Sequence, residues 1–342
     1  MRLLLGLALF LLVPPQEAPS IPKSEFKERQ ERLSKSLGGE LILLTADRLA
    51  EGEPGIDSNT ARFDFSYLTG TYREGAVLVL HEGTAILFDS DPEAAGKAAA
   101  VENIRSKKDY DDFLKTVLPA AKRLHVWHHP RRKSEEPNES PKWKEIHPEL
   151  EILTDVNNAA SRLRVIKSAA ELACLRKAAD ATSKAHLEAM KTSKPGLNES
   201  DIQKTIETMF RKEGCPRNAF PSICGSGKNG VILHYMANKD ELAKETMIVM
   251  DIGAEYLGYA ADITRTIPLD GKYTDEHRKA YQAVLDAQKA AEAKLKPGAT
   301  WKDLDAAAVA VLDERGYDKT GYKNFHGLGH FVGLSVHDSG PY

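Results

Sequence analysis

One short stretch limits most strongly what this chain can fold into: residues 250–266, MDIGAEYLGYAADITRT. It contains Asp251 and Asp262 in apolar or β-prone surroundings, and a buried carboxylate is costly unless it is paired, hydrogen-bonded or bound to a metal. Asp251 ends an apolar run, and GAEYLG contains the glycines that a turn needs. The segment therefore predicts a β-hairpin that brings both carboxylates to one face. An alternative needs no ligand: Asp251 caps the turn and Asp262 pairs with Arg265.

Four histidines lie in two stretches that flank this aspartate pair. His326, His330 and His337 fall within HGLGHFVGLSVHD, where glycine lets backbone and side chains crowd together. His234 lies in the apolar GVILHYMAN, where an imidazole needs a partner. A single such histidine is commonly a satisfied core residue, but four of them beside two carboxylates indicate a metal site. Carboxylate oxygens with one imidazole suit Mn²⁺, Co²⁺, Fe²⁺ or Zn²⁺.

Alternating helix and strand patterns predict two domains over the 342 residues. The first, residues 21–155, is expected to be a small α/β domain, with a helix in SEFKERQERLSKSLGG and strands in ELILLTA, FDFSYLTG, GAVLVLHEG and TAILFDS. The second, residues 165–342, is expected to be α+β. It combines two helices and a strand cluster with two more helices, at 274–295 and 300–315, and a last glycine-rich strand in HGLGHFVGLSVHD.

The first twenty residues, MRLLLGLALFLLVPPQEAPS, have the pattern of a signal peptide. One early positive charge precedes an apolar run from Leu3 to Val13, and prolines and small residues follow. The run is too short to span a bilayer. We therefore expect residues 1–20 to be a cleaved signal peptide, and the protein to be exported, periplasmic or secreted, without a stable membrane span.

Composition excludes other classes of protein. The net charge of −3 leaves no basic field for nucleic acid. GSGKNG at 225–230 lacks the Ser or Thr that follows the lysine of a phosphate loop. Cys174, Cys215 and Cys224 match no zinc spacing, and buried free thiols are preferred over a single Cys215–Cys224 bridge.

ILHY, MDIGAEYLGYAADITRT and HGLGHFVGLSVHD resemble, in order, the three signature blocks of the Xaa-Pro aminopeptidases and prolidases, the pita-bread metallopeptidases. DGKYTDEHRKAYQAVLDAQ and LKPGATWKDLDAAA resemble the stretches that join those blocks, so the resemblance runs from Val165 to the last residue. FDFSYLTGTYREGAVLVL is similar to the N-terminal domain of aminopeptidase P. The resemblance implies an α/β first domain and a pita-bread α+β catalytic domain with a curved antiparallel sheet.

The resemblance also implies a set of metal ligands. Asp251, Asp262 and His330 would bind two divalent ions, Mn²⁺ before Co²⁺, Fe²⁺ or Zn²⁺, with Asp262 bridging both. A hydroxide shared by the two ions would attack the scissile carbonyl. Family members carry two further glutamate ligands, in a Glu-Pro-Gly block and a final Glu-Asp block, whereas this chain stops at HDSGPY. We therefore expect a C-terminally incomplete catalytic domain, and we expect the 342-residue chain to be inactive by itself.

The remaining histidines would act on the substrate. By resemblance, His234 and His337 would hold it and stabilise the tetrahedral intermediate, and His326 would line the pocket. The implied activity is hydrolysis of the bond between an N-terminal residue and a following proline in peptides, by a homodimer or homotetramer. A prolidase restricted to dipeptides and a non-catalytic peptide-binding pita-bread module remain alternatives. A creatinase-like amidinohydrolase needs no metal, so the retained ligands disfavour it.

Overall fold

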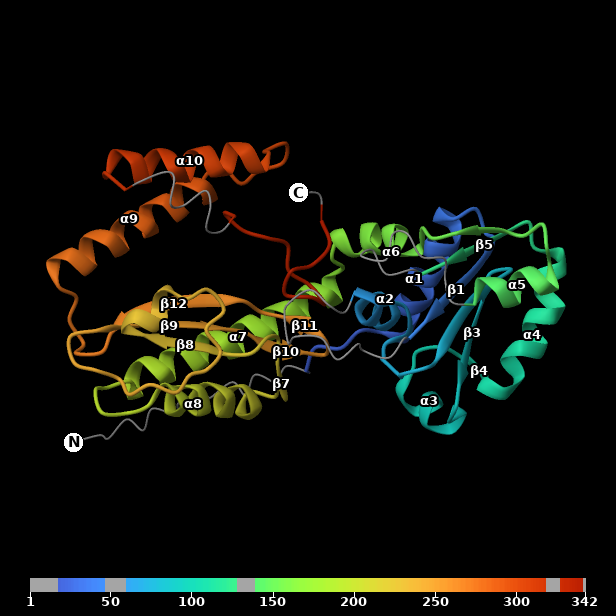
Figure 1. The fold of residues 1–342 in the computed structure, drawn as a ribbon, viewed down its shortest axis with the longest axis horizontal. Helices are drawn as coiled ribbons and strands as arrows, with labels where there is room; N and C mark the ends of the chain where they lie inside the picture. The colour runs from blue at the N-terminus through green and yellow to red at the C-terminus, as the bar shows by residue number, and fades with distance from the viewer. Residues whose placement is uncertain (1–17, 47–59, 128–138, 318–326, 341–342) are drawn as a thin grey trace, which may run out of the picture.

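The computed structural model describes residues 18–46, 60–127, 139–317 and 327–340 (Figure 1). Residues 1–17 of the predicted signal peptide and His326 lie outside these ranges. In chain order the described elements are α1 (Lys23–Ser36), β1 (Leu41–Thr45), α2 (Thr60–Thr69), β2 (Val77–His81), β3 (Thr84–Asp89), α3 (Pro92–Ala98), β4 (Asn103–Ser106), η1 (Lys107–Asp109), α4 (Tyr110–Val117), η2 (Leu118–Ala120), β5 (Arg123–Val126), α5 (Ser140–Ile146), β6 (Glu151–Leu153), α6 (Val156–Val165), α7 (Ala169–Thr192), α8 (Glu199–Lys212), β7 (Arg217–Asn218), β8 (Ile223–Ser226), η3 (Gly227–Val231), β9 (Met247–Ile252), β10 (Ala254–Tyr256), β11 (Tyr259–Ala260), β12 (Ile263–Pro268), α9 (Asp275–Glu292) and α10 (Trp301–Glu314).

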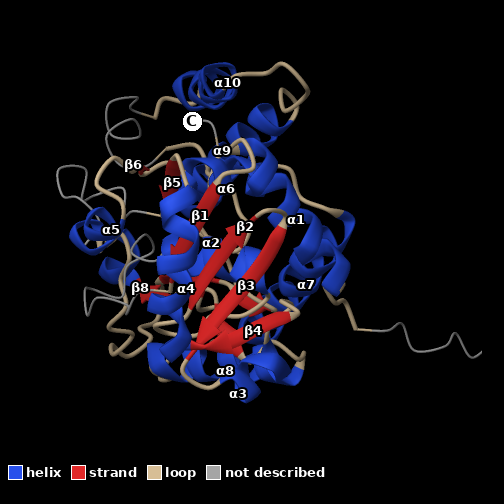
Figure 2. Ribbon diagram, turned by 90° about the vertical axis from the view of Figure 1, so that its right-hand side faces the viewer, coloured by secondary structure: helices blue, strands red, loops and turns tan. Residues whose placement is uncertain are grey.

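The N-terminal half is built on a six-stranded sheet in the order β4-β3-β2-β1-β5-β6 (Figure 2). β2 runs antiparallel to β1 and β3, and the other pairs are parallel. Leu41 and Leu43 of β1 pack with α4 on one face of the sheet, while Ile42 and Leu44 pack with α1 and α2 on the other. Successive side chains of a strand point to opposite faces, so burial on both faces explains why every one of these positions is apolar.

The expectation of a strand in FDFSYLTG is wrong, because this segment lies within α2 and the turn that follows it. Phe65, Tyr67 and Leu68 enter the core that β1 shares with α1. Alternating aromatic residues favour a strand only where a strand partner exists. Here packing of the helix on the sheet overrides that local preference.

The C-terminal half layers helices and strands differently. α7 and α8 cover one face of two short antiparallel sheets, β12-β9-β8 and β11-β10-β7. The shared core contains Ala181 and Ala185 of α7, Ile206 of α8 and Met250 of β9. α9 and α10 form a helical hairpin that lies on the other side of the strands and has its own small core (Figure 1). The strand face that does not pack on α7 and α8 is therefore turned toward the α9–α10 hairpin (Figure 1).

Two further expectations are decided by the fold. The predicted strand in HGLGHFVGLSVHD is wrong, because residues 327–340 contain bends and no strand. The three cysteines are free and buried, as preferred. Within the described part of the chain, no helix is long and apolar enough to cross a membrane.

Candidate metal centre

The segment that carries both aspartates forms the predicted hairpin. β9 pairs antiparallel with β12, which places Asp251 opposite Thr264. β10 and β11 extend the hairpin to a two-residue turn, Leu257–Gly258. Both turn residues have positive φ, 50° and 87°, the backbone geometry that matches the twist of a tight hairpin.

The pleat of β9 decides which way Asp251 faces. Ile248, Met250 and Ile252 are fully buried in the core against α7 and α8. Val249 and Asp251 alternate with them and line a pocket on the opposite face. The apolar run that precedes Asp251 thus anchors the strand and leaves the carboxylate at the pocket.

Gly253 allows the two strands to approach closely between the aspartates. A Cβ atom there would lie 1.9 Å from the carbonyl oxygen of Ala261 and 2.7 Å from the ring of Phe220. Ala261 in turn donates its amide to the carbonyl of Ala254 at 2.9 Å. Only glycine leaves room for this backbone packing, which sets the position of Asp262 next to Ala261.

His330 reaches the hairpin from the C-terminal segment. Its Nε2 lies 3.1 Å from Oδ2 of Asp262, and its Nδ1 lies 3.0 Å from the carbonyl oxygen of Phe331. The hydrogen bond with Asp262 raises the pKa of His330 above its ordinary value, although burial acts in the opposite direction. His337 packs against His330 with ring centroids 4.2 Å apart. Two neighbouring histidines of the C-terminal segment thus meet the hairpin that carries an aspartate from far away in the sequence.

His234 approaches the same pocket from the loop after η3. It is exposed and its backbone is in the left-handed region, with φ of 56°. The neighbouring Tyr235 donates its hydroxyl to Oε2 of the buried Glu199 at 2.8 Å. Glu199 also accepts hydrogen bonds from the backbone amides of Ser226 and Asp240, at 2.7 and 3.0 Å. One buried carboxylate therefore fixes the loop that carries His234.

Burial alone would raise the pKa of Glu199, but these hydrogen bonds outweigh it and lower the pKa. The sequence reasoning missed this residue. Asn198, the residue before it, caps α8, whereas the partners of Glu199 lie 27 to 41 residues away, beyond the reach of a local pattern.

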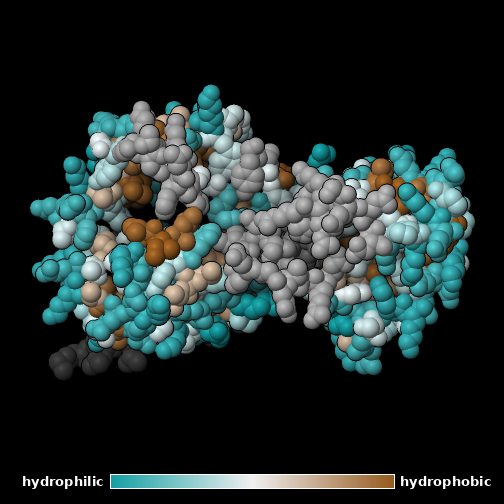
Figure 3. Space-filling view, in the orientation of Figure 1, coloured by the Kyte–Doolittle hydropathy of each residue, from teal (hydrophilic) through white to brown (hydrophobic). Residues whose placement is uncertain are grey.

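All five described candidates line one pocket of about 770 Å³: Asp251, Asp262, His234, His330 and His337. Its mouth carries Val231, Ile232 and Leu233, each at least half exposed. Figure 3 shows hydrophobic side chains gathered at a hollow between the strands and the α9–α10 hairpin. The pocket thus combines ionisable groups with an apolar rim, as small-molecule and peptide sites do.

The donor chemistry fits a divalent metal. A histidine that binds a metal through one ring nitrogen usually donates the other to a carbonyl or carboxylate, and His330 has this arrangement through Phe331. Asp262 and His330 are in contact, and Asp251 lines the same pocket. Within residues 18–46, 60–127, 139–317 and 327–340, however, no three His, Cys, Asp or Glu side chains converge closely enough to hold an ion together.

Comparisons with known proteins identify the family of this chain. Residues 173–342 match Metallopeptidase family M24. A Xaa-Pro aminopeptidase of Haemophilus influenzae is 30% identical over 364 residues, which cover 94% of this chain and 82% of that protein. The chain therefore belongs to metallopeptidase family M24. A Xaa-Pro aminopeptidase of Escherichia coli is 34% identical over 206 residues, but this match covers only 46% of that protein.

Solved structures show the same fold. Aminopeptidase PepP from Pseudomonas aeruginosa superimposes with a TM-score of 0.81 at 27% identity, covering 94% of this chain and 82% of that one. A zinc-substituted Escherichia coli aminopeptidase P in complex with product gives a TM-score of 0.78 at 27% identity, with 94% and 83% covered. The expected pita-bread fold is thereby confirmed.

Proposed function

We propose that this protein is a metal-dependent exopeptidase that hydrolyses the bond between an N-terminal residue and a following proline. The observation that carries the proposal is the contact of Asp262 with His330 in the pocket that Asp251 also lines. The names of its family and of its relatives, Xaa-Pro aminopeptidases, support it.

In this proposal Asp251, Asp262 and His330 hold the metal, with Mn²⁺ as the preferred ion. When bound, divalent cations polarise the scissile carbonyl and stabilise the charge that develops on it. The hairpin contributes rigidity, because the pairing of β9 with β12 holds Asp251 directly and holds Asp262 through the next residue, Ile263, the first of β12. The hydrogen bond from Nδ1 of His330 to Phe331 orients the imidazole so that Nε2 faces the pocket.

His337 and His234 act on the substrate. His337 lies against His330 and lines the pocket, and His234 stands at its mouth beside Val231, Ile232 and Leu233. An imidazole in such a place can donate a hydrogen bond to the carbonyl oxygen or deliver a proton to the departing nitrogen. The nitrogen of proline carries no hydrogen in the peptide bond, so it must gain this proton when it leaves. The apolar rim suits the pyrrolidine ring.

We also propose that the protein acts after export, on proline-containing peptides outside the cytoplasm, as a homodimer or homotetramer. The apolar run from Leu3 to Val13 supports export. Detection of the chain in a periplasmic or secreted fraction, with its N-terminus after Ser20, tests this proposal.

Calorimetric titration with Mn²⁺ tests the metal centre without relying on turnover. The wild-type chain is expected to bind, and Asp262→Asn and His330→Gln are each expected to weaken binding at least about 10-fold. His147→Gln is the matched control, since His147 caps α5 in the N-terminal half. A wild-type chain that binds no Mn²⁺ would overturn the proposal in favour of a peptide-binding module.

Peptide hydrolysis tests the specificity. Where the protein turns over peptides, we expect cleavage of Ala-Pro-Ala and none of Ala-Ala-Ala, and cleavage of Ala-Pro alone would identify a prolidase instead.

A further inference from the structure

Asp338 directly follows His337 and organises the segment that carries the site histidines. It is only 3% exposed, and its amide donates to the carbonyl of Phe331 at 2.9 Å. A Cβ atom on Gly333 would lie 1.9 Å from Oδ2 of Asp338, so the carboxylate occupies the space that a side chain would need. Residues 331–338 thus fold around this one carboxylate, without strand pairing.

Arg164 joins this carboxylate to the N-terminal half. It lies in the last turn of α6 and is 2% exposed. Its Nη2 donates to Oδ1 of Asp338, and its Nη1 donates to Oδ1 of Asp64 in α2 at 2.7 Å. Asp64 also accepts a hydrogen bond from Nε1 of Trp127 at 2.9 Å. One guanidinium therefore contacts both the N-terminal domain and the histidine segment.

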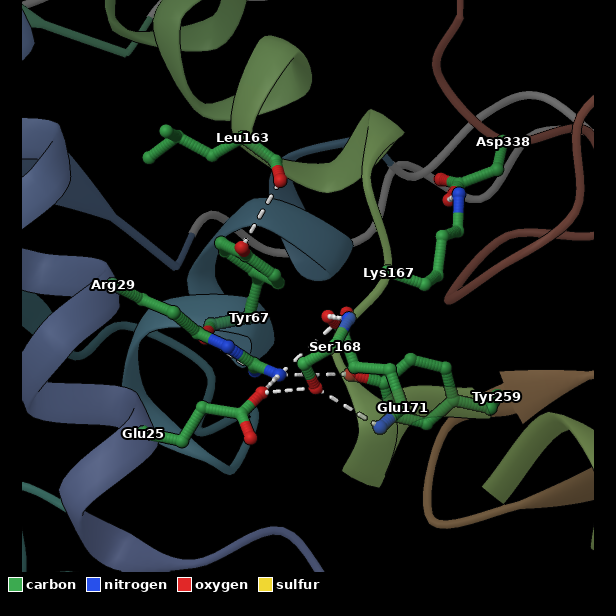
Figure 4. Close-up of polar contacts among 9 residues, drawn as sticks. All are labelled: Glu25, Arg29, Tyr67, Leu163, Lys167, Ser168, Glu171, Tyr259 and Asp338. Carbon is green, nitrogen blue, oxygen red and sulfur yellow. Dashed lines mark hydrogen bonds and ion pairs between the residues drawn. The ribbon is translucent and has the colours of Figure 1, made fainter. Parts of the chain in front are cut away.

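Lys167 completes the charge balance of the cluster. Its Nζ lies 3.1 Å from Oδ2 of Asp338. Figure 4 shows the two side chains pointing toward each other. Two cations, Arg164 and Lys167, thus face two carboxylates, Asp64 and Asp338, almost out of contact with water. Removing one member of such a buried set leaves an uncompensated charge, so the loss of any one residue is expected to destabilise the contacts of the others.

A second polar cluster secures the same junction (Figure 4). Arg29 of α1 lies 3.3 Å from the hydroxyl of Tyr259 and 3.5 Å from Oε1 of Glu171 at the start of α7. Ala260, next to Tyr259, donates its amide to the carbonyl of Gly333 at 2.8 Å. The histidine segment therefore rests on β11 at one side and on Arg164 at the other.

We propose that Arg164 is a positioning residue for the metal centre: it makes the geometry of residues 327–340 depend on the docked N-terminal domain. Through Asp64 the guanidinium is fixed in that domain, and through Asp338 it fixes His337 and the loop that carries His330. The consequence for metal binding rests on the proposed function, whereas the anchoring of the segment does not.

The test compares Asp64→Asn with wild type in the full chain, because Asp64 is remote in sequence from the segment it is proposed to stabilise. Hydrogen exchange followed by mass spectrometry should show amides of 327–340 exchanging at least about 10-fold faster, with β9 unchanged as an internal reference. Mn²⁺ affinity by calorimetry should fall by about 10-fold. The matched control is Glu213→Gln, which breaks the exposed Lys184–Glu213 pair and should alter neither quantity.

Arg164→Lys provides the second variant if Asp64→Asn folds poorly. A lysine keeps the charge but cannot contact two carboxylates through a planar fork, so it should show a smaller acceleration in the same segment. Unchanged exchange of 327–340 in a folded Asp64→Asn or Arg164→Lys protein would overturn the inference. Faster exchange in 327–340, together with no Mn²⁺ binding even by wild type, would support the anchoring and refute the proposed function.

Discussion

The two halves of the candidate metal centre are held by different means. Asp251 and Asp262 belong to the hairpin that backbone hydrogen bonds align strand by strand. His330 and His337 belong to a segment without strand pairing, which is held in place by the buried side chains of Asp338 and Arg164. The carboxylate half therefore depends on atoms that every residue has, while the histidine half depends on a few individual side chains. Removing one of those side chains should therefore loosen the second half without disturbing the first.

The largest effect should come from forcing a side chain into the hairpin. Gly253→Ala places a methyl group 1.9 Å from the Ala261 carbonyl, a backbone atom that cannot rotate away. We expect a loss of about 3 kcal/mol in the free energy of unfolding, measured by urea denaturation. Gly96→Ala is the control, because the nearest atom there is Cδ1 of Ile104 at 3.9 Å and alanine favours the helix. A well-tolerated Gly253→Ala would show that the hairpin is not the stiffer half.

A medium effect should follow from Glu199→Gln, which weakens the anchor under His234. At pH 7 we expect a loss of about 2 kcal/mol in the free energy of unfolding, because the charged acceptor of several hydrogen bonds is removed.

The pH dependence of this effect has a definite sign. The pKa of Glu199 is lowered in the folded protein, so its contribution is complete above the unfolded value of 4.5 and disappears as the pH falls through the folded pKa. Urea denaturation from pH 7 to pH 3 should therefore show the wild type and Glu199→Gln converging at acid pH. A constant difference over this range would assign the effect to packing.

The smallest effect should come from the matching substitution in the histidine half. A Cβ atom on Gly340 would lie 2.0 Å from the ring of Phe331, which is a side chain and can turn aside. Gly340→Ala is therefore expected to cost about 1 kcal/mol, clearly less than Gly253→Ala. The added methyl group should shift Phe331 against Trp301, whose ring centroid is 5.8 Å away, so tryptophan fluorescence reports the change. Equal losses in the free energy of unfolding for the two glycine substitutions would show that the two halves are equally rigid.

Local sequence patterns correctly predicted the helices and strands that depend on a regular spacing of apolar residues. The helices α1, α9 and α10 and the aspartate hairpin are found where they were expected, and α7 and α8 are the two helices expected before the strand cluster of the second domain. The predicted metal ligands Asp262 and His330 meet, although their roles remain predictions.

The failures occurred where distant side chains decide the structure. α2 is a helix because it packs on the sheet, and its Asp64 is satisfied by Arg164, 100 residues later. The last glycine-rich segment is not a strand, and Asp338 finds Arg164 from 174 residues away. The two partners of each pair lie too far apart in the sequence for a local pattern to reveal their contact.

The three buried cysteines allow local unfolding of the protein to be measured through the reactivity of their thiols. Burial raises the pKa of Cys174 to about 11 and that of Cys224 to about 12, and it raises that of Cys215 as well, so none is a thiolate at neutral pH. Cys174 packs in the cluster that contains Leu334 and Tyr259, whereas Cys215 and Cys224 pack under the hairpin. Alkylating reagents should therefore modify each cysteine of the native chain only as fast as its region unfolds. The rate at Cys174 would report the opening of the domain junction, and the rates at Cys215 and Cys224 would report the opening of the strand core.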